Sequence, residues 1–309
     1  MPQSPSPFLR IGTRGSKLAR YQAELVQRLL KEKAGIACEL VIVKTSGDRI
    51  LDRPLADAGG KGLFTKELEE ALLRNEIDLA VHSMKDVPVD IPAGLKIAAL
   101  LPREDARDAF LSAKAKTLLE LPKGAVIGTS SVRRKAQVAR ARPDLEIRLL
   151  RGNVDTRLAK LDAGEFDAIL LAMAGLKRLG LAARVTSIVP LDSWLPALAQ
   201  GAIGIETRDD DVAKQIALLN DETTAIALAC ERAFQASLDG SCRTSIGGYA
   251  KLEKDRLIFE GEVLAPDGSA FAGEKFDVQL SGDLVSEAAR LGREAGLTLK
   301  PRVAQWLTL

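Results

Sequence analysis

The sequence predicts an α/β protein with two related lobes, followed by a small α+β domain with a three-stranded antiparallel sheet. The first 200 or so residues alternate short apolar runs with helical patterns, which is typical of parallel sheets with crossover helices. The last third places three strand-like runs in succession without crossovers, which indicates an antiparallel sheet. The 309 residues exceed what a single core usually serves, so two or three domains are expected.

Expected strands alternate with expected helices in the first half of the chain. Ser16 precedes a helical pattern of leucines, and a serine in this position typically caps the first turn of a helix. Cys38, Leu40 and Ile42 show the alternation of a strand. The expected strands lie at 8–12, 38–42, 79–83, 126–128, 146–150 and 168–172, and the expected helices lie after Ser16, at 65–74, from Ser131 and from Asn153.

Two short motifs occur twice in this half of the chain. Ile11-Gly12-Thr13 is echoed by Ile127-Gly128-Thr129. Glu76-Ile77-Asp78 is echoed by Glu165-Phe166-Asp167. Together these echoes indicate two lobes of related topology with a cleft between them. Both Gly-Thr turns would fall at the carboxyl ends of strands, where open α/β sheets bind their ligands.

Two segments are expected to connect the lobes. Residues 102–108 are charged and would cross from the first lobe to the second, and residues 194–204, rich in small and apolar side chains, would return. The expected domains are a first α/β lobe at 1–101 with 202–220, a second α/β lobe at 106–196 and an α+β domain at 223–309. The last domain is expected to contain a helix at 225–237, strands at 246–251, 257–264 and 276–280, and a final helix from Asp283.

Composition excludes several classes of protein. The 44 basic and 42 acidic side chains nearly cancel, and aromatic residues make up only 4%, so nothing favours a nucleic-acid partner. Residues 1–7 lack the apolar run of a signal peptide, and the most apolar stretch, 168–176, is too short to span a bilayer. Three cysteines without metal or redox spacing and a single histidine, His82, argue against a metal site. We therefore expect a cytoplasmic protein with no metal and no membrane partner, in which His82 is structural.

The strongest local candidate for chemistry is the pair Lys85-Asp86. It follows the expected strand at 79–83 directly and is stopped by Pro88. A solvated turn would explain an arbitrary Lys-Asp pair equally well. The position at the carboxyl end of an expected parallel strand favours a functional interpretation.

Arginines at junctions between loops and helices form the second candidate. Guanidinium groups bind carboxylates with two parallel hydrogen bonds, and helix N-termini also attract anions. Neighbouring hydroxyls, such as those of Thr129 and Ser131, add donors. The pattern predicts a site for a small polyanionic ligand, although arginines can simply decorate helix surfaces. The arginines concerned are Arg14, Arg133, Arg134, Arg151, Arg157 and Arg178.

The third candidate is Cys242, which lies in a glycine-rich turn beside Arg243. Such a thiol is accessible, and a neighbouring cation can lower its pKa. Cys38 and Cys230 are interpreted as buried small hydrophobic residues. The glycine-rich run at 59–62 lacks the spacing of a phosphate-binding P-loop, so a hinge or lid is the preferred interpretation.

These segments resemble the porphobilinogen deaminase family along nearly the whole chain. The resemblance implies two lobes like those of periplasmic binding proteins and a third domain that holds a dipyrromethane cofactor through a thioether to Cys242. The matching stretches are RIGTRGS (10–16), GGKGLF (59–64), VHSMKDVP (81–88), PREDARDAF (102–110), GTSSVRR (128–134), RGNVDTR (151–157), AQGAIGIE (199–206) and the loop around Cys242.

The resemblance also implies an activity and a role for each matched residue. The enzyme would join four molecules of porphobilinogen head to tail on the cofactor, expel ammonia and release linear hydroxymethylbilane for tetrapyrrole synthesis. Asp86 would be the catalytic carboxylate, which stabilises positive charge on the pyrrole. The residues implied for cofactor binding are Cys242, Lys85, Arg133, Arg134, Ser131 and Thr129. Those implied for substrate binding are Arg14, Ser16, Arg151, Arg157 and Arg178.

A competing class is a two-lobed binding module that senses an anionic ligand without catalysis, because a fold alone does not separate the two. Such a module has no use for the Cys242 loop or for Asp86. A degenerate homologue is disfavoured, since Asp86, Cys242 and the arginines are all present.

Overall fold

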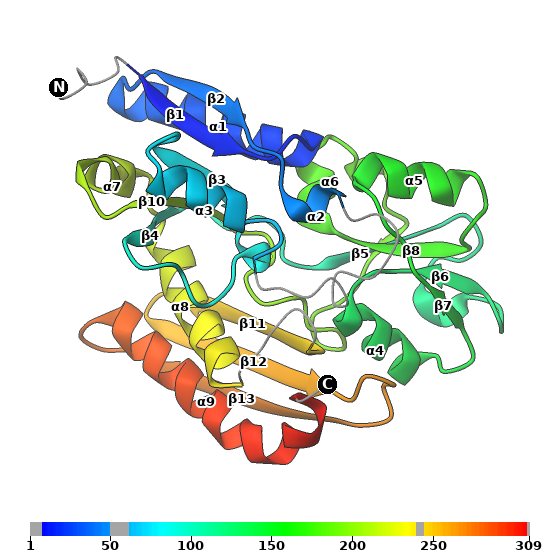
Figure 1. Cartoon of the computed structure of the whole chain (residues 1–309). Coiled ribbons are helices and arrows are strands. Elements are labelled where there is room, and N and C mark those ends of the chain that lie inside the picture. Colours follow the sequence, from blue (N-terminus) through cyan, green and yellow to red (C-terminus); the bar gives the residue numbers. More distant parts are fainter. Residues whose placement is uncertain (1–7, 50–61, 239–243, 308–309) are drawn as a thin grey trace. The chain divides into compact units, whose positions relative to one another are not determined.

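The computed structural model describes residues 8–49, 62–238 and 244–307, which divide into two compact units. The first unit contains the described residues up to Arg103 together with 202–225. The second contains residues 104–201 and the described residues from Ile226 onward. Figure 1 labels most of the helices and strands of both units.

A five-stranded mixed sheet forms the centre of the first unit, in the order β2-β1-β3-β10-β4. Its strands are β1 (Leu9–Thr13), β2 (Cys38–Ile42), β3 (Leu79–Ser83), β4 (Leu95–Leu100) and β10 (Ile203–Arg208). Strand β1 is parallel to β2 and β3, whereas β10 runs antiparallel to β3 and β4. The helices are α1 (Lys17–Ala34), α2 (Ser46–Arg49), α3 (Lys66–Leu73), α7 (Asp211–Ile216) and the start of α8 (Glu222–Ser237).

Two helices cover the two faces of this sheet. Leu79 and Val81 pack in a core with Val26 of α1, while the intervening Ala80 packs in a separate core with Leu68 of α3. Alternate residues of a strand point to opposite faces, so β3 is buried on both sides. This explains why β3 reads as a continuous apolar run.

The limits of α1 follow from its caps. The Ser16 hydroxyl accepts a hydrogen bond from the Ala19 amide (3.3 Å), as predicted for an N-cap. Gly35 ends the helix in the left-handed conformation (φ 68°), which glycine adopts without strain. The other expected elements of the first half also appear within a few residues of their predicted limits.

The second unit contains a five-stranded sheet with the same arrangement, β7-β6-β8-β5-β9. Strand β6 is parallel to β7 and β8, and β5 runs antiparallel to β8 and β9. The strands are β5 (Asp108–Ser112), β6 (Val126–Gly128), β7 (Glu146–Arg148), β8 (Ala168–Ala172) and β9 (Ser187–Ile188), and the helices are α4 (Val132–Ala141), α5 (Val154–Asp162) and α6 (Met173–Arg178). The prediction of two lobes of related topology is confirmed.

The repeated motifs contact each other in both lobes. A Cβ atom on Gly12 would lie 2.3 Å from Ile77 Cδ1, and one on Gly128 would lie 2.7 Å from the Phe166 ring, so a larger residue at either position would displace that side chain. Asp78 accepts a hydrogen bond from the Arg10 amide at 2.8 Å. Asp167 accepts the equivalent bond from the Val126 amide at 2.7 Å. The two motifs that recur in the sequence therefore make the same packing contact and the same backbone hydrogen bond in each lobe.

The second unit also contains a three-stranded antiparallel sheet near the C-terminus, in the order β11-β12-β13. Its strands are β11 (Ile246–Glu253), β12 (Arg256–Leu264) and β13 (Phe271–Gln279), and α8 and α9 (Leu284–Leu307) share its core. Gly292 of α9 approaches α8 closely, because a Cβ there would lie 2.1 Å from the Cys230 carbonyl oxygen. The prediction of an antiparallel α+β part at the C-terminus is confirmed.

Three details differ from the sequence-based expectation. Both large sheets are mixed rather than parallel, since each contains one antiparallel strand. Strands β4, β5, β9 and β10 were not expected, and β13 begins five residues before the expected strand at 276–280. The division into three domains and the cleft between lobes stay predictions. No helix in the described ranges is long and apolar enough to cross a membrane.

Candidate active site

Predicted site residues follow the carboxyl ends of two neighbouring strands in the first unit. Strands β1 and β3 are parallel and paired, with Ile11 opposite Leu79. Arg14 and Ser16 come directly after β1, and Lys85 and Asp86 come directly after β3. The carboxyl ends of parallel strands meet at one edge of a sheet, which is where α/β folds place ligands. The expected location of these side chains is therefore confirmed.

Asp86 lies in a single turn of 3₁₀-helix, η2 (Met84–Asp86). The turn is held at its base, because Met84 is buried and its amide donates to the Ala202 carbonyl oxygen (3.0 Å). Lys85 is exposed and Asp86 is partly buried. Among the residues that the structure describes, no hydrogen bond or ion pair engages the Asp86 carboxylate. The backbone that carries Asp86 is thus anchored, while its carboxylate has no partner among the described residues.

Arg14 already has a partner within the first unit. Its guanidinium group forms an ion pair with Asp48 of α2, with Nε at 3.2 Å from both carboxylate oxygens, and lies 4.0 Å from the centre of the Phe64 ring. Burial alone would raise the pKa of Asp48, but hydrogen bonds from Arg14 and Thr45 lower it. The Ser16 hydroxyl caps α1. A ligand carboxylate would therefore share Arg14 with Asp48.

The corresponding edge of the second unit holds the other predicted residues. Thr129 and Ser131 follow β6, and the Thr129 hydroxyl accepts a hydrogen bond from the Ser131 amide (3.1 Å). The Ser131 hydroxyl in turn caps α4 by accepting from the Arg134 amide (3.4 Å). This stiff turn starts α4, so Arg133 and Arg134 project from the first turn of a helix whose position is fixed.

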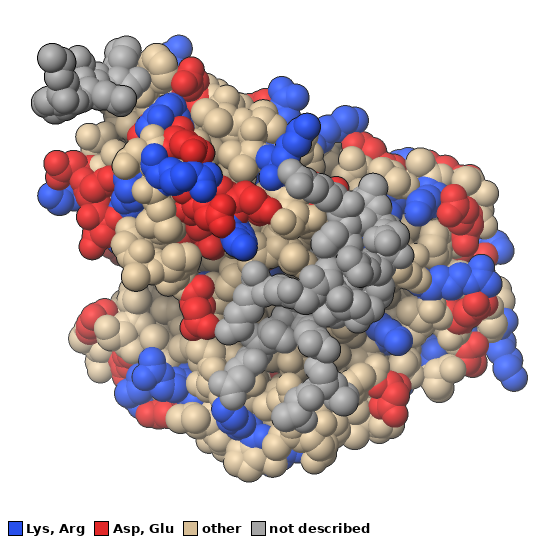
Figure 2. Space-filling model, in the orientation of Figure 1, with Lys and Arg blue, Asp and Glu red and all other residues tan. Residues whose placement is uncertain are grey.

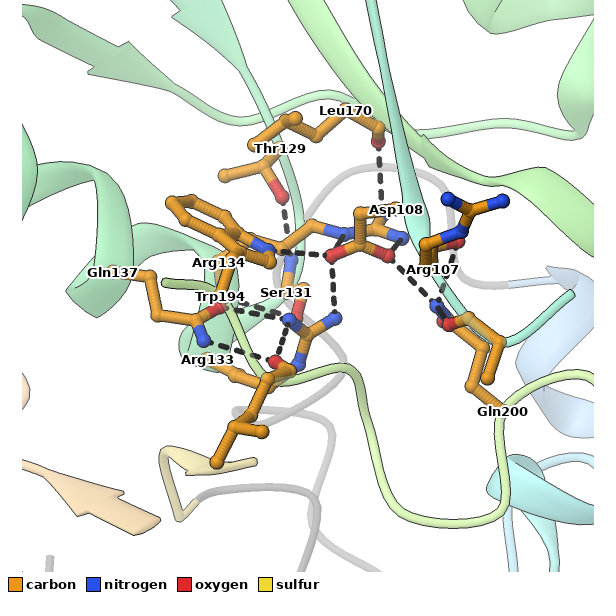
Figure 3. A network of polar contacts seen from close by, with 12 residues as sticks. Arg107, Asp108, Thr129, Ser131, Arg133, Arg134, Gln137, Leu170, Trp194 and Gln200 are labelled. Carbon is orange, nitrogen blue, oxygen red and sulfur yellow. Dashed lines mark hydrogen bonds and ion pairs between the residues drawn. The ribbon is translucent and has the colours of Figure 1, made fainter. Parts of the chain in front are cut away.

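Arg133 and Arg134 converge on one buried carboxylate, that of Asp108 at the start of β5 (Figure 3). Arg134 donates hydrogen bonds to this carboxylate from Nε (3.0 Å) and Nη2 (2.7 Å), and Arg133 donates one from Nη2 (2.9 Å). Trp194 and Gln200 donate to the same carboxylate at 2.9 and 2.8 Å. The three charged side chains together carry one net positive charge.

Electrostatics explains why this cluster tolerates burial. Desolvation alone would raise the pKa of Asp108, but the charges of Arg133 and Arg134 hold it far below its usual range. Burial lowers the pKa of Arg133, and the charge of Asp108 opposes that shift. Within the described part of the chain, the buried Nε of Arg133 has no hydrogen-bond partner. Such an orphaned donor next to excess positive charge is suited to an anionic ligand.

The remaining arginines occupy the same edge of the second unit. Arg157 Nε donates to the Gly152 carbonyl oxygen (2.8 Å), and Arg178 Nη2 donates to that of Gly201 (2.6 Å). Arg151 is 9% exposed, and burial lowers its pKa. Figure 2 shows both signs of charge interspersed over the face drawn. The arginines that the sequence analysis selected in this unit are therefore mostly buried or held by hydrogen bonds to backbone carbonyls. They are not part of a basic surface patch.

Other expectations have mixed outcomes. His82 is 5% exposed and lies 3.0 Å from Glu206, which confirms its structural interpretation. Cys230 is fully buried as expected, but Cys38 is only partly buried, because β2 is an edge strand. Cys242 and the glycine-rich run at 59–61 lie outside the described residues. Asp108 was missed, because its hydrogen-bond partners lie 25 or more residues away in the sequence and leave no local pattern.

Comparisons with known proteins decide the family. A family model described as "Porphobilinogen deaminase, dipyromethane cofactor binding domain" matches residues 9–215, and one described as "Porphobilinogen deaminase, C-terminal domain" matches 225–301. The chain belongs to the porphobilinogen deaminase family. It is 50% identical to the porphobilinogen deaminase of Nitrobacter hamburgensis over 300 residues, which cover 96% of this chain and 93% of that one. Identity to the Paracoccus denitrificans protein is 54% over 276 residues, with 87% and 88% covered.

Membership of the porphobilinogen deaminase family makes the chain a transferase of tetrapyrrole biosynthesis with a dipyrromethane-binding domain. Among solved structures, the methionine-binding protein MetQ gives a TM-score of 0.45 at 16% identity, covering 69% of this chain and 89% of that one. The fold assignment rests on the sheet topology of the chain itself. No group of three or more potential metal ligands gathers among the residues that the structure describes.

Proposed function

We propose that the chain joins four molecules of porphobilinogen head to tail on a dipyrromethane bound covalently to Cys242, and releases ammonia and linear hydroxymethylbilane. It would act in the cytoplasm as a monomer, without nucleic-acid or membrane partners. The observation that carries the proposal is the buried arginine pair with its excess positive charge and orphaned Arg133 Nε donor. Pyrroles that bear acetate and propionate groups supply the matching carboxylates.

The second unit fits the cofactor. Ser245, three residues after Cys242, donates a hydrogen bond to the carbonyl oxygen of Val132, the residue before Arg133 (3.2 Å). This contact supports a cofactor arm that begins close to the arginine pair. When bound, the dipyrromethane supplies the pyrrole carbon to which the first substrate is joined. Arg133 and Arg134, with Thr129, Ser131 and Lys85, would bind its carboxylates.

The other two cysteines are poor alternatives for attachment. Cys230 is fully buried, and burial raises its pKa well above the usual range. Burial also raises the pKa of Cys38 to about 11. Because the thiolate is the nucleophile, both thiols are nearly inert at neutral pH. This favours Cys242 by comparison.

The proposed chemistry assigns separate roles to the remaining residues. Loss of ammonia from porphobilinogen leaves a positive charge delocalised over its pyrrole ring. The Asp86 carboxylate would stabilise that charge and help to move protons at the pyrrole nitrogen. Arg14, Ser16, Arg151, Arg157 and Arg178 would bind substrate carboxylates.

The intact mass of the purified protein tests the proposal. We expect it to exceed the mass of the sequence by one dipyrromethane, and Cys242→Ser to remove that excess together with the consumption of porphobilinogen. Cys38→Ser is the matched control and should retain both. A mass equal to that of the bare sequence, or added mass that survives Cys242→Ser, would contradict covalent attachment at this residue.

A further inference from the structure

We propose that Asp108 is a positioning residue, which holds Arg133 and Arg134 in the geometry that binds cofactor or substrate carboxylates; this rests on the proposed function. Asp108 does not itself face a ligand in this scheme. It acts as a built-in carboxylate that fixes two cations side by side.

The hydrogen bonds around Asp108 support this role. Its two oxygens accept five hydrogen bonds, of 2.7 to 3.0 Å, and it is 1% exposed. Figure 3 shows that Trp194 and Arg134 approach the carboxylate from one side and Gln200 from the other. Since every acceptor position is filled by buried donors, the carboxylate has one orientation, and each guanidinium that grips it is fixed in turn.

Each arginine is held at a second point as well. Arg133 Nη1 donates to Gln137 (2.7 Å) and to the Leu195 carbonyl oxygen (2.9 Å). Arg134 Nη1 donates to the Leu170 carbonyl oxygen (2.9 Å). With these contacts made, the Nε edge of Arg133 is the part of that guanidinium without a partner among the described residues. Asp108 therefore determines which edge of Arg133 is left for a ligand.

Charge makes Asp108 necessary for this arrangement. Two buried guanidinium groups repel each other, and the charge of Arg134 indeed lowers the pKa of Arg133. Asp108 cancels one of the two charges, and the remaining charge attracts a carboxylate. Without Asp108 one arginine would turn away or take up another anion, because an uncompensated buried charge is costly.

A second Asp with two arginines provides a comparison within the chain. Asp78 accepts two hydrogen bonds from the Arg10 guanidinium (2.9 and 3.0 Å) and one from the Arg10 amide (2.8 Å), and it lies 3.6 Å from Arg208. Asp78 directly precedes β3, so the trio lies at the amino end of that strand, opposite the end that Asp86 follows. It has the same chemistry as the Asp108 trio but no predicted ligand residue. Asp78 is therefore a matched control for the loss of an Arg-bound carboxylate.

The test compares Asp108→Asn, Asp108→Glu and Asp78→Asn in the full chain, by melting temperature, intact mass, KM and kcat. We expect Asp108→Asn to lose the dipyrromethane mass or to raise KM at least tenfold with a smaller change in kcat. Asp108→Glu, which keeps the charge, should recover part of that loss. Asp78→Asn should lower the melting temperature while it retains the mass and KM.

A milder variant keeps the test decisive if Asp108→Asn does not fold. Trp194→Phe removes one hydrogen bond to Asp108 and preserves an aromatic ring, and we expect KM to rise about threefold to tenfold with kcat nearly unchanged. The inference is overturned if a folded Asp108→Asn keeps both mass and KM, or if Trp194→Phe leaves KM unchanged. Unmodified protein without the added mass would instead contradict the proposed function.

Discussion

Asp86 is the single residue on which the proposed chemistry depends most. The turn that carries it is anchored by the buried Met84, and no ion pair among the described residues neutralises its carboxylate. We expect Asp86→Asn to lower turnover by about 100-fold or more, because the amide has the shape of the acid but not its charge. The melting temperature should stay nearly constant, since little in the fold depends on the carboxylate. Asp90→Asn, at an exposed acid four residues further on, is the control. Steady-state rates of porphobilinogen consumption measure both, and equal rates would remove Asp86 from its role.

Residue type and local position allowed part of the site to be predicted. Asp86 directly follows a strand, and Arg133 and Arg134 follow a serine that caps a helix, so short-range patterns revealed them. Asp108 could not be identified in this way. Its donors are Arg133, Arg134, Trp194 and Gln200, from 25 to 92 residues away in the sequence. Pairing over such separations is a property of the tertiary structure and leaves no local pattern.

Among the elements, those with strong periodicity were predicted well and those with long-range partners were not. The expected strands at 79–83, 126–128 and 168–172 match β3, β6 and β8, each of which is paired with its neighbours in a βαβ series. Strands β5 and β10 were not expected, and the segments expected to connect the lobes, 102–108 and 194–204, overlap only their first residues. Each pairs antiparallel with the last strand of that series, with residues that lie far away in the sequence, and such a pairing leaves no local pattern.

The hairpin before β13 sets the position of α4, the helix that carries Arg133 and Arg134. Gly268 has φ 75°, and a Cβ there would lie 2.5 Å from the Ala136 carbonyl oxygen of α4. We expect Gly268→Ala to lower the free energy of unfolding by about 1–3 kcal/mol more than Gly282→Ala. Gly282 is the control because it has a similar φ of 70° but open space around its Cβ position, so it reports the backbone strain alone, about 1 kcal/mol. Urea denaturation measures the difference, and equal losses would show that α4 and the hairpin move apart at no cost.

At the scale of the whole molecule, acidic and basic side chains nearly balance, but a net positive charge remains in one buried cluster. The net charge is +2, and acidic and basic side chains are interspersed on the surface drawn in Figure 2. The positive charge that matters for an anionic ligand is instead buried, in the trio of Arg133, Arg134 and Asp108. A buried charge is screened less by salt than a surface charge. The trio also couples the stability of the second unit to pH.

This coupling predicts a specific acid response. Because the arginines hold the folded pKa of Asp108 far below its unfolded value of about 4, its contribution to stability is complete above that pH. The contribution of the Asp108 charge to the free energy of unfolding is lost as the pH falls further, by about 1.4 kcal/mol per pH unit.

We therefore expect the urea midpoint of the unmodified protein to be level from pH 7 to about 5 and to fall below pH 4. In Asp108→Asn the midpoint should be lower at neutral pH, and the gap between the two proteins should narrow in acid. Asp192→Asn, at an exposed acid with no hydrogen bond or ion pair among the described residues, should follow the unmodified protein at every pH. A gap between Asp108→Asn and the unmodified protein that stays constant from pH 7 to pH 3 would show that Asp108 does not stabilise the fold through its charge.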